Sequence, residues 1–137
     1  MQEKSIGGNL PPVLALAFLG DARHSLFIRK MLVKRGIAKS GELNALAQEY
    51  VTAEAQAKAF SMREGRLSED ELGVFKRAFN STHLNKPKRA SGKDYRTATG
   101  FEAVIGMLDY LNENERIEEL LTIACGLSEG DKNDTED

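Results

Sequence analysis

The sequence predicts an all-α protein, and three observations support this class. Apolar residues recur every three or four positions along most of the chain, which is the spacing of one helical face. No stretch of useful length alternates apolar and polar residues as a half-buried strand does, and no internal repeat is visible. The 137 residues are enough for one domain with a substantial core. We therefore expect a single helical bundle.

The first predicted helix begins at two prolines and ends before a glycine. Pro11 and Pro12 suit a helix start, because the first N–H groups of a helix have no internal partner. Gly36 is typical of the position just after a helix end. Between these limits the apolar residues follow helical spacing, at Val13, Leu16, Ala17, Leu26, Ile28, Leu32 and Val33.

Two shorter helices are predicted next. Ser40 is a plausible start for a second helix, over residues 43–50. Thr52 is expected to be the N-cap of a third helix, over residues 53–63, which is rich in alanine.

Three further helices are predicted in the second half of the chain. Ser68 to Glu71 resembles a capping box, with acids at the positive end of a fourth helix that runs to Phe79. Residues 80–94 contain proline, glycine and serine and are expected to form a loop. A fifth helix is predicted over residues 94–112, and a sixth over residues 114–126.

The charge is unevenly distributed, although the net charge is only −2. Residues 113–137 carry nine acids and two bases, whereas residues 1–112 carry 12 acids and 17 bases. The main part of the chain could therefore present a basic face to a polyanion. We expect one domain over residues 1–127, followed by an acidic disordered tail over residues 128–137.

The sequence favours the cytoplasm. The longest strictly apolar run, Val13 to Leu19, is far shorter than the roughly 20 residues that a membrane-spanning helix needs. The N-terminus has no apolar segment typical of a signal peptide. A single cysteine, Cys125, cannot form an internal disulfide, and we expect it to be a small buried apolar residue.

Two acids stand out because their sequence neighbours are apolar and small. Asp21 follows the segment Leu14 to Gly20, and Glu102 lies between Gly100 and Gly106. A carboxylate in an apolar setting is unfavourable unless a cation, a proton or a hydrogen-bond donor compensates it. Two such acids predict one shared site, and magnesium (Mg2+) is the simplest partner because it prefers hard oxygen ligands.

A structural interpretation of each acid remains open from the local pattern. Asp21 could lie at the rim of the core and bond to Arg23 or Arg96. Glu102 could point outward from a helix whose glycines serve only for close packing. Asp109, seven residues further along the fifth helix, is expected to be a surface residue.

Two basic clusters are candidates for phosphate contacts. The first lies between residues 86 and 96 and consists of Lys86, Lys88, Arg89, Lys93 and Arg96. Such a run is most often a solvated loop, but beside a metal site it could hold phosphates. Tyr95 could then stack or bond near a ribose. The second cluster lies at the end of the first helix and consists of Arg29, Lys30, Lys34 and Arg35. Complementing the helix dipole is the simpler explanation for half of these residues.

Two motifs resemble the ribonuclease III family. Phe18-Leu19-Gly20-Asp21-Ala22 resembles the signature of the ribonuclease III catalytic domain, and Phe101-Glu102-Ala103-Val104-Ile105-Gly106 resembles its second acidic motif. Ala17 stands where family members usually carry a glutamate, and Thr99 where they usually carry an aspartate. This pattern, with the segment Val51 to Ala57, resembles the Mini-ribonuclease III branch, which lacks a double-stranded-RNA-binding domain.

The resemblance implies a ribonuclease III-like helical bundle, a homodimer and cleavage of both strands of duplex RNA. It implies that Asp21 and Glu102 are catalytic and hold magnesium, and that the basic residues 86–96 contact RNA. The typical substrate of the branch is the precursor of the large-subunit (23S) ribosomal RNA, and whether a ribosomal protein assists is left open by the sequence. The alternative is a non-catalytic RNA- or protein-binding module that retains the fold, since Ala17 and Thr99 replace two acids.

Overall fold

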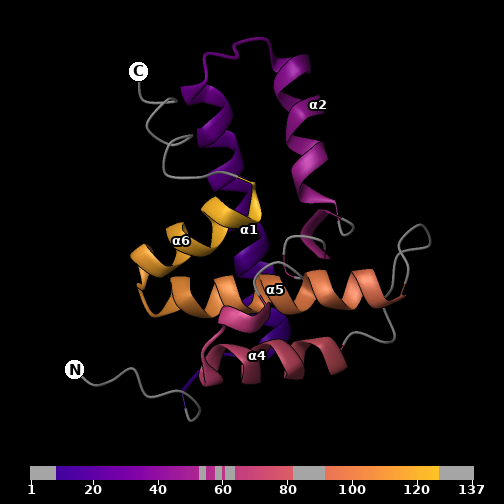
Figure 1. The fold of residues 1–137 in the computed structure, drawn as a ribbon, viewed down its shortest axis with the longest axis vertical. Helices are drawn as coiled ribbons and strands as arrows, with labels where there is room; N and C mark the ends of the chain where they lie inside the picture. The colour runs from indigo at the N-terminus through magenta and orange to yellow at the C-terminus, as the bar shows by residue number, and fades with distance from the viewer. Residues whose placement is uncertain (1–8, 53–54, 58–59, 61–63, 82–91, 127–137) are drawn as a thin grey trace.

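The computed structural model describes residues 9–52, 55–57, 60, 64–81 and 92–126 (Figure 1). This part of the chain is helical and contains no strand, which confirms the predicted class. Its elements are α1 (Val13–Lys34), α2 (Ser40–Val51), the 3-10 turn η1 (Glu64–Arg66), α4 (Glu69–Asn80), α5 (Gly92–Tyr110) and α6 (Asn114–Ala124).

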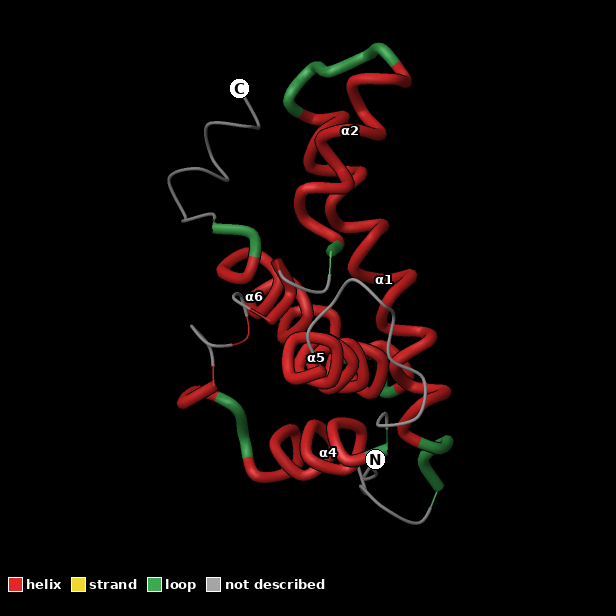
Figure 2. Tube along the Cα trace, turned by 90° about the vertical axis from the view of Figure 1, so that its right-hand side faces the viewer, coloured by secondary structure: helices red, strands yellow, loops and turns green. Residues whose placement is uncertain are grey.

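Helix α5 is the centre of the bundle. Figure 2 looks along α5 and shows α1, α4 and α6 arranged around it. Every residue of α5 from Thr97 to Leu108 is buried except Glu102. A helix that is buried on all sides has no need of a polar face. The partial exposure of Glu102 is therefore the exception on this helix and marks an opening in the packing.

Helices α1 and α5 cross with their backbones in contact. A Cβ atom built on Gly20 would collide with the backbone carbonyl of Glu102, and one built on Gly106 would collide with the carbonyl of Leu16. Only glycine fits at both positions, because any side chain would force the two helices apart. Gly20 and Gly106 therefore fix where along each helix the crossing occurs.

For α1, α2, α4, α5 and α6, the predicted helix ends lie within three residues of the observed ones. Helix α6 ends at Ala124 rather than Gly126, and α2 and α5 also differ. Helix α2 begins at Ser40 rather than Leu43, because the Leu43 N–H already donates to the Lys39 carbonyl at 2.9 Å. Helix α5 begins at Gly92, before the predicted start at residue 94. It ends at Tyr110, before the predicted end at residue 112. It ends there because Asn112 has a φ of 61°, in the left-handed region that terminates helices.

Two of the predicted caps are present. Ser68 and Glu71 form the capping box of α4, with each side chain accepting from the backbone N–H of the other. Thr52 accepts from the N–H of Ala55 at 3.1 Å, as expected of an N-cap. The predicted third helix is helical at residues 55–57 and 60, and its other residues lie outside the described part of the chain.

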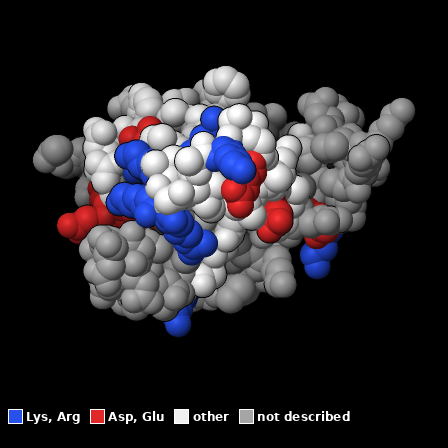
Figure 3. All heavy atoms as spheres, turned by 90° about the horizontal axis from the view of Figure 1, so that it is seen from above, with Lys and Arg blue, Asp and Glu red and all other residues white. Residues whose placement is uncertain are grey.

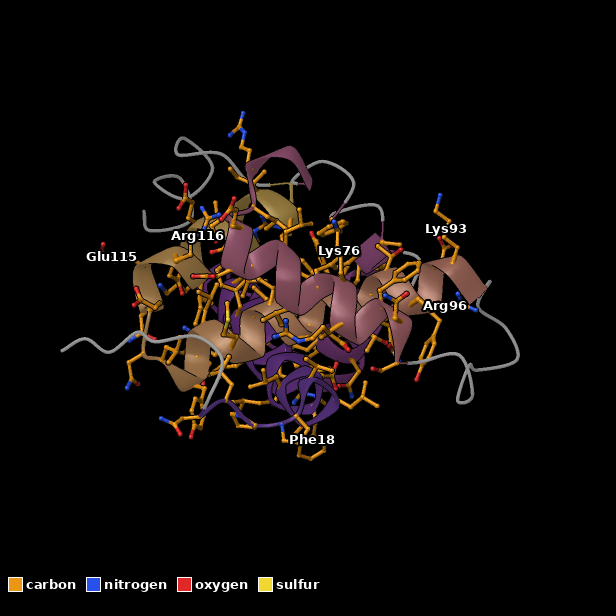
Figure 4. All side chains as sticks on the ribbon, turned by 90° about the horizontal axis from the view of Figure 1, so that it is seen from below. Phe18, Lys76, Lys93, Arg96, Glu115 and Arg116 are labelled. Atoms are coloured by element: carbon orange, nitrogen blue, oxygen red, sulfur yellow. The ribbon has the colours of Figure 1, made fainter. Side chains whose placement is uncertain are left out.

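A buried ion pair between α4 and α6 was not predicted. Glu71 is only 5% exposed, and Arg116 binds both of its carboxylate oxygens, at 2.7 and 2.9 Å. Burial opposes ionisation of Glu71, but the hydrogen bonds from Arg116 and from the Ser68 backbone hold its pKa below the usual value. Figure 4 shows Arg116 beside the start of α4. This pair fixes the end of α6 that lies against α4.

Cys125 is half-buried rather than fully buried, because it follows the end of α6. It packs against the cluster formed by Ile28, Met31 and Leu32 of α1. Burial raises the pKa of its thiol to about 12, with a small opposing effect from Arg35. The thiol is therefore protonated near neutral pH, which agrees with a packing role.

We expect the Gly106→Ala variant to be destabilised, because its new methyl group would collide with the α1 backbone. The free energy of unfolding should fall by about 1–3 kcal/mol or more, as measured by urea denaturation. Gly73→Ala in α4 is the matched control, since its Cβ would meet only the Arg77 guanidinium, at 3.7 Å. That variant should be up to about 1 kcal/mol more stable. Equal stability of the two variants would show that the crossing is not tightly packed.

Candidate active site

The helix crossing brings Asp21 and Glu102 together. Asp21 directly follows Gly20 on α1, and Glu102 lies one turn before Gly106 on α5. Both side chains line the same hollow, and the proximity of Asp21 contributes to raising the pKa of Glu102. Residues 81 positions apart in the sequence therefore form one acidic pair, as the shared-site interpretation predicted.

The two acids have different environments. Asp21 is exposed, so the expectation of an aspartate inside an apolar setting is wrong. Its apolar neighbours Ala17 and Phe18 line the same hollow, but the aspartate itself lies exposed at the rim of the crossing. Glu102 is half-buried, and burial raises its pKa to about 8, with a further contribution from Asp21. Without a cation, the pair therefore carries a proton near neutral pH.

An open hollow of about 330 Å³ surrounds the acidic pair. It is lined by Leu14, Ala17, Phe18, Asp21, Tyr95, Thr99 and Glu102. The hydroxyl of Thr99 donates to the carbonyl of Tyr95 at 2.9 Å, within its own helix. Ala17 and Thr99, which stand where the family usually has acids, therefore contribute space rather than negative charge.

Gln56 is a direct partner of Glu102 that the sequence did not identify as a site residue. Its side-chain amide donates to Oε2 of Glu102 at 3.0 Å, and the residue is only 3% exposed. This hydrogen bond opposes the rise in the pKa of Glu102. Gln56 lies in the segment Val51 to Ala57 that carries the family resemblance, but no local pattern reveals a bond to a residue 46 positions away.

His24 lies one helical turn after Asp21 and is also buried. Burial lowers its pKa to about 4, although the charge of Asp21 acts in the opposite direction. Its ring meets the edge of Phe101 at a centroid distance of 6.1 Å. The imidazole is therefore neutral at physiological pH and serves as part of the core beneath the acidic pair.

The basic partners considered for Asp21 are engaged elsewhere. Arg23 pairs with Asp109 at 3.4 Å and lies 3.8 Å from Glu118. The Arg96 guanidinium stacks over the Phe79 ring, 5.7 Å from its centroid. The structural interpretation of Asp21 as a partner of either arginine is thus not supported. Asp109 is a surface ion-pair residue, as expected.

The structure describes only two members of the proposed RNA-contacting cluster. Lys93 and Arg96 lie on the first turns of α5, where Figure 4 shows both at the same end of the helix. Tyr95 lines the hollow between them and the acids. Lys86, Lys88 and Arg89 lie outside the described residues.

The second basic cluster is exposed at the end of α1. Figure 3 shows lysine and arginine side chains grouped on the face at the top of Figure 1, where α1 leads into α2. Its members are Arg29, Lys30, Lys34 and Arg35. Lys34 in the last turn and Arg35 at the C-cap agree with the dipole role, whereas Arg29 and Lys30 lie further from the helix end.

An apolar side chain projects into solvent beside the acidic pair. Phe18 is 83% exposed, and Figure 4 shows it pointing away from α1. Leu14, one turn earlier on the same side of the helix, is 41% exposed. Large apolar side chains exposed together are typical of interaction surfaces.

Comparison with known proteins agrees with this geometry. The Ribonuclease III domain model matches residues 14–113. A Mini-ribonuclease 3 from Brevibacillus brevis is 42% identical over 90% of this chain and 92% of its own length. A Mini-ribonuclease 3 from Streptococcus pneumoniae is 40% identical over 89% and 97%. A crystal structure of a protein from Fusobacterium nucleatum superposes with a TM-score of 0.79 at 30% identity, covering 86% of this chain and 94% of that one.

The similarity to these relatives covers about nine tenths of the chain, and the range matched by the family model contains both acidic motifs. Among the described helices, none is long and apolar enough to cross a membrane. The chain belongs to the ribonuclease III family, in its Mini-ribonuclease 3 branch, and is an endoribonuclease.

Proposed function

We propose that this endoribonuclease cleaves double-stranded RNA with the help of magnesium held by Asp21 and Glu102. The observation that supports this most directly is the pairing of the two carboxyl groups in an open hollow at the α1–α5 crossing. Two acids that share a proton are a poor structural arrangement, but they become favourable when a cation lies between them.

The donor set suits magnesium. Within the described residues, no group of three or more His, Cys, Asp or Glu side chains gathers. Magnesium commonly binds through one or two carboxylates and keeps several waters, so the acidic pair alone is a sufficient set of protein ligands. The bound ion would lower the pKa of a water and stabilise the phosphate undergoing hydrolysis. Asp21 and Glu102 would hold the ion in place. The positive charge of the ion would keep both carboxylates ionised.

Basic residues near the start of α5 are proposed to bind the RNA backbone. Lys93 is exposed there, Tyr95 lines the hollow, and Arg96 lies over the Phe79 ring. We extend this surface to Lys86, Lys88 and Arg89 from the sequence alone. Lysine and arginine contacts with phosphates would position a duplex without reading its sequence.

We propose that the protein acts as a homodimer through Phe18 and Leu14. Both are exposed apolar residues at the rim of the hollow, so a second copy that covered them would lie next to the acidic pair. A two-fold dimer would match the pseudo-symmetry of duplex RNA and place one site at each strand.

The proposed substrate is the precursor of the 23S ribosomal RNA in the cytoplasm, and the proposed further partner is a ribosomal protein. This proposal rests on the resemblance to the Mini-ribonuclease 3 branch. The structure favours catalysis over the non-catalytic alternative, because the loss of acids at Ala17 and Thr99 has left the remaining pair together in one accessible hollow. Residues 1–127 are proposed to form the catalytic domain and residues 128–137 a separate acidic tail.

The Asp21→Asn and Glu102→Gln variants should each lose cleavage of a long RNA duplex by at least about a hundredfold, because each lacks one proposed metal ligand. Binding of the same duplex should be retained. The measurements are single-turnover cleavage at saturating magnesium and fluorescence anisotropy of labelled RNA. Asp109→Asn is the matched control and should cleave within about threefold of the parent. Normal cleavage by either site variant would exclude the two-carboxylate site.

The stability of the metal-free protein should depend on Glu102 in a defined pH range. Its pKa is about 8 in the folded protein and 4.5 in an unfolded chain, so the folded state binds the additional proton. Stability from this group is present below pH 4.5 and is lost as the pH rises to about 8.

His24 acts in the opposite direction below pH 6.5, because its pKa falls from 6.5 to about 4 on folding. The difference in melting temperature between the parent and Glu102→Gln therefore isolates the carboxyl group. Measured by calorimetry in a chelator, the variant should gain relative to the parent as the pH rises from 4.5 to about 8. A difference that does not change with pH would show that Glu102 is ionised throughout.

Replacing Phe18 with Ser should shift the protein toward the monomer, because it removes the most exposed apolar side chain beside the site. Light scattering after size exclusion, at micromolar concentration, would measure the mass. Val33→Ser is the control, since Val33 is 62% exposed on the same helix, four turns from Phe18. A parent protein that is monomeric, or a Phe18→Ser variant as dimeric as Val33→Ser, would contradict the proposed interface.

A further inference from the structure

We infer that Gln56 is a positioning residue that holds the Glu102 carboxylate for the divalent cation and sets the affinity of the site for that cation. The inference rests on the proposed function, because it concerns the same two-carboxylate site. It adds Gln56 to the site as a third side chain, which is proposed to contact neither the cation nor the RNA.

The hydrogen bonds fix the orientation of the Gln56 amide. Its Nε2 donates to Oε2 of Glu102 at 3.0 Å and to the carbonyl of Val51 at 3.1 Å. Nε2 has two N–H groups, and both are used by these two acceptors. The reversed orientation would place Oε1 against two oxygens, so it is excluded when Glu102 is ionised.

The local backbone explains why the side chain reaches Glu102. Val51 is the last residue of α2, and its carbonyl is left without a helical partner when the helix ends. Thr52 has an extended backbone with ψ of 156° and starts the next helical segment, in which the Gln56 N–H donates to the Thr52 carbonyl at 3.0 Å. Gln56 is thus held one turn into that segment, and its side chain joins the end of α2 to α5.

Bonding to the Val51 carbonyl accounts for only one of the two donors of the Gln56 amide. The residue is 3% exposed, and among the described residues its Oε1 has no hydrogen-bond partner. A buried amide oxygen without a partner is unfavourable, and an apolar side chain of the same length would avoid it. The amide is favourable only through its two donors, and one of these is directed at the proposed metal ligand.

The effect on Glu102 is specific. The Gln56 amide nitrogen can only donate, so its bond to Oε2 at 3.0 Å suits an ionised carboxylate, which is the form that a cation needs. The bond uses one lone pair of Oε2 and leaves the rest of the carboxylate able to bind a cation. Partners that orient a ligand in this way typically change metal affinity by about 10–100-fold when they are removed.

The test is manganese binding to Gln56→Met, which keeps the side-chain length and removes the amide. Free Mn2+ is measured by electron paramagnetic resonance during a titration of the RNA-free protein. We expect the dissociation constant to rise about 10–100-fold, with RNA binding in chelator unchanged. Cleavage should recover at high magnesium, because the acids remain. Gln48→Met, at an exposed position of α2, is the control and should bind Mn2+ like the parent.

Two further variants separate positioning from folding. Gln56→Asn keeps the amide but is one methylene too short, so it should lose the same affinity without creating an apolar surface. In a Glu102→Gln background, Gln56→Met should cause no further loss of cleavage at subsaturating magnesium, because its target is already gone. An equal loss in both backgrounds, or Mn2+ binding by Gln56→Met equal to that of the parent, would overturn the role of Gln56.

These results are distinguishable from failure of the proposed function. Normal cleavage by Glu102→Gln would remove the two-carboxylate site and this inference with it. Loss of cleavage in Glu102→Gln, together with parental Mn2+ affinity in Gln56→Met, would leave the site intact and reject only the positioning role.

Discussion

The backbone contact between α1 and α5 is the constraint on which the site depends. Gly20 and Gly106 allow the two helices to touch, and a side chain at either position would separate them. Because the crossing point is fixed on both helices, the residue after Gly20 and the residue one turn before Gly106 face the same side. The chain therefore positions its two site acids through packing in the interior rather than through a flexible loop, which gives a rigid arrangement.

The site combines this rigid placement with an unfavourable charge arrangement. Glu102 is the only residue between Thr97 and Leu108 of α5 that is not buried, and its pKa of about 8 shows that the protein alone does not stabilise its negative charge. A cation in the hollow would provide that stabilisation, so metal binding should release a proton and become stronger as the pH rises. The repulsion between the two carboxyl groups without metal and the affinity of the site for a metal would have the same electrostatic origin.

The sequence predicted what depends on nearby residues and missed what depends on distant ones. The capping box at Ser68 and the Thr52 cap involve residues three apart, so their spacing identifies them. Glu102 was recognised from its apolar neighbours, and the same reasoning was wrong for Asp21, because neighbours in sequence do not show which face of a helix is covered. The Glu71–Arg116 and Gln56–Glu102 bonds join residues about 45 positions apart, and only the fold brings them together.

In a site with only two acids, cation binding would depend more on the neutral side chains around the acids and on the substrate. Ala17 and Thr99 leave space where the family usually has negative charge, so the protein offers the cation fewer ligands. Magnesium fills its remaining positions with water or with phosphate oxygens. When phosphate oxygens take these positions, RNA and metal each strengthen the binding of the other, since linkage between two ligands is reciprocal. Under these conditions the orientation of each carboxylate would affect cation binding more than it does in a site with four acids. A neutral donor such as Gln56 can orient Glu102 without adding another charge near the cation.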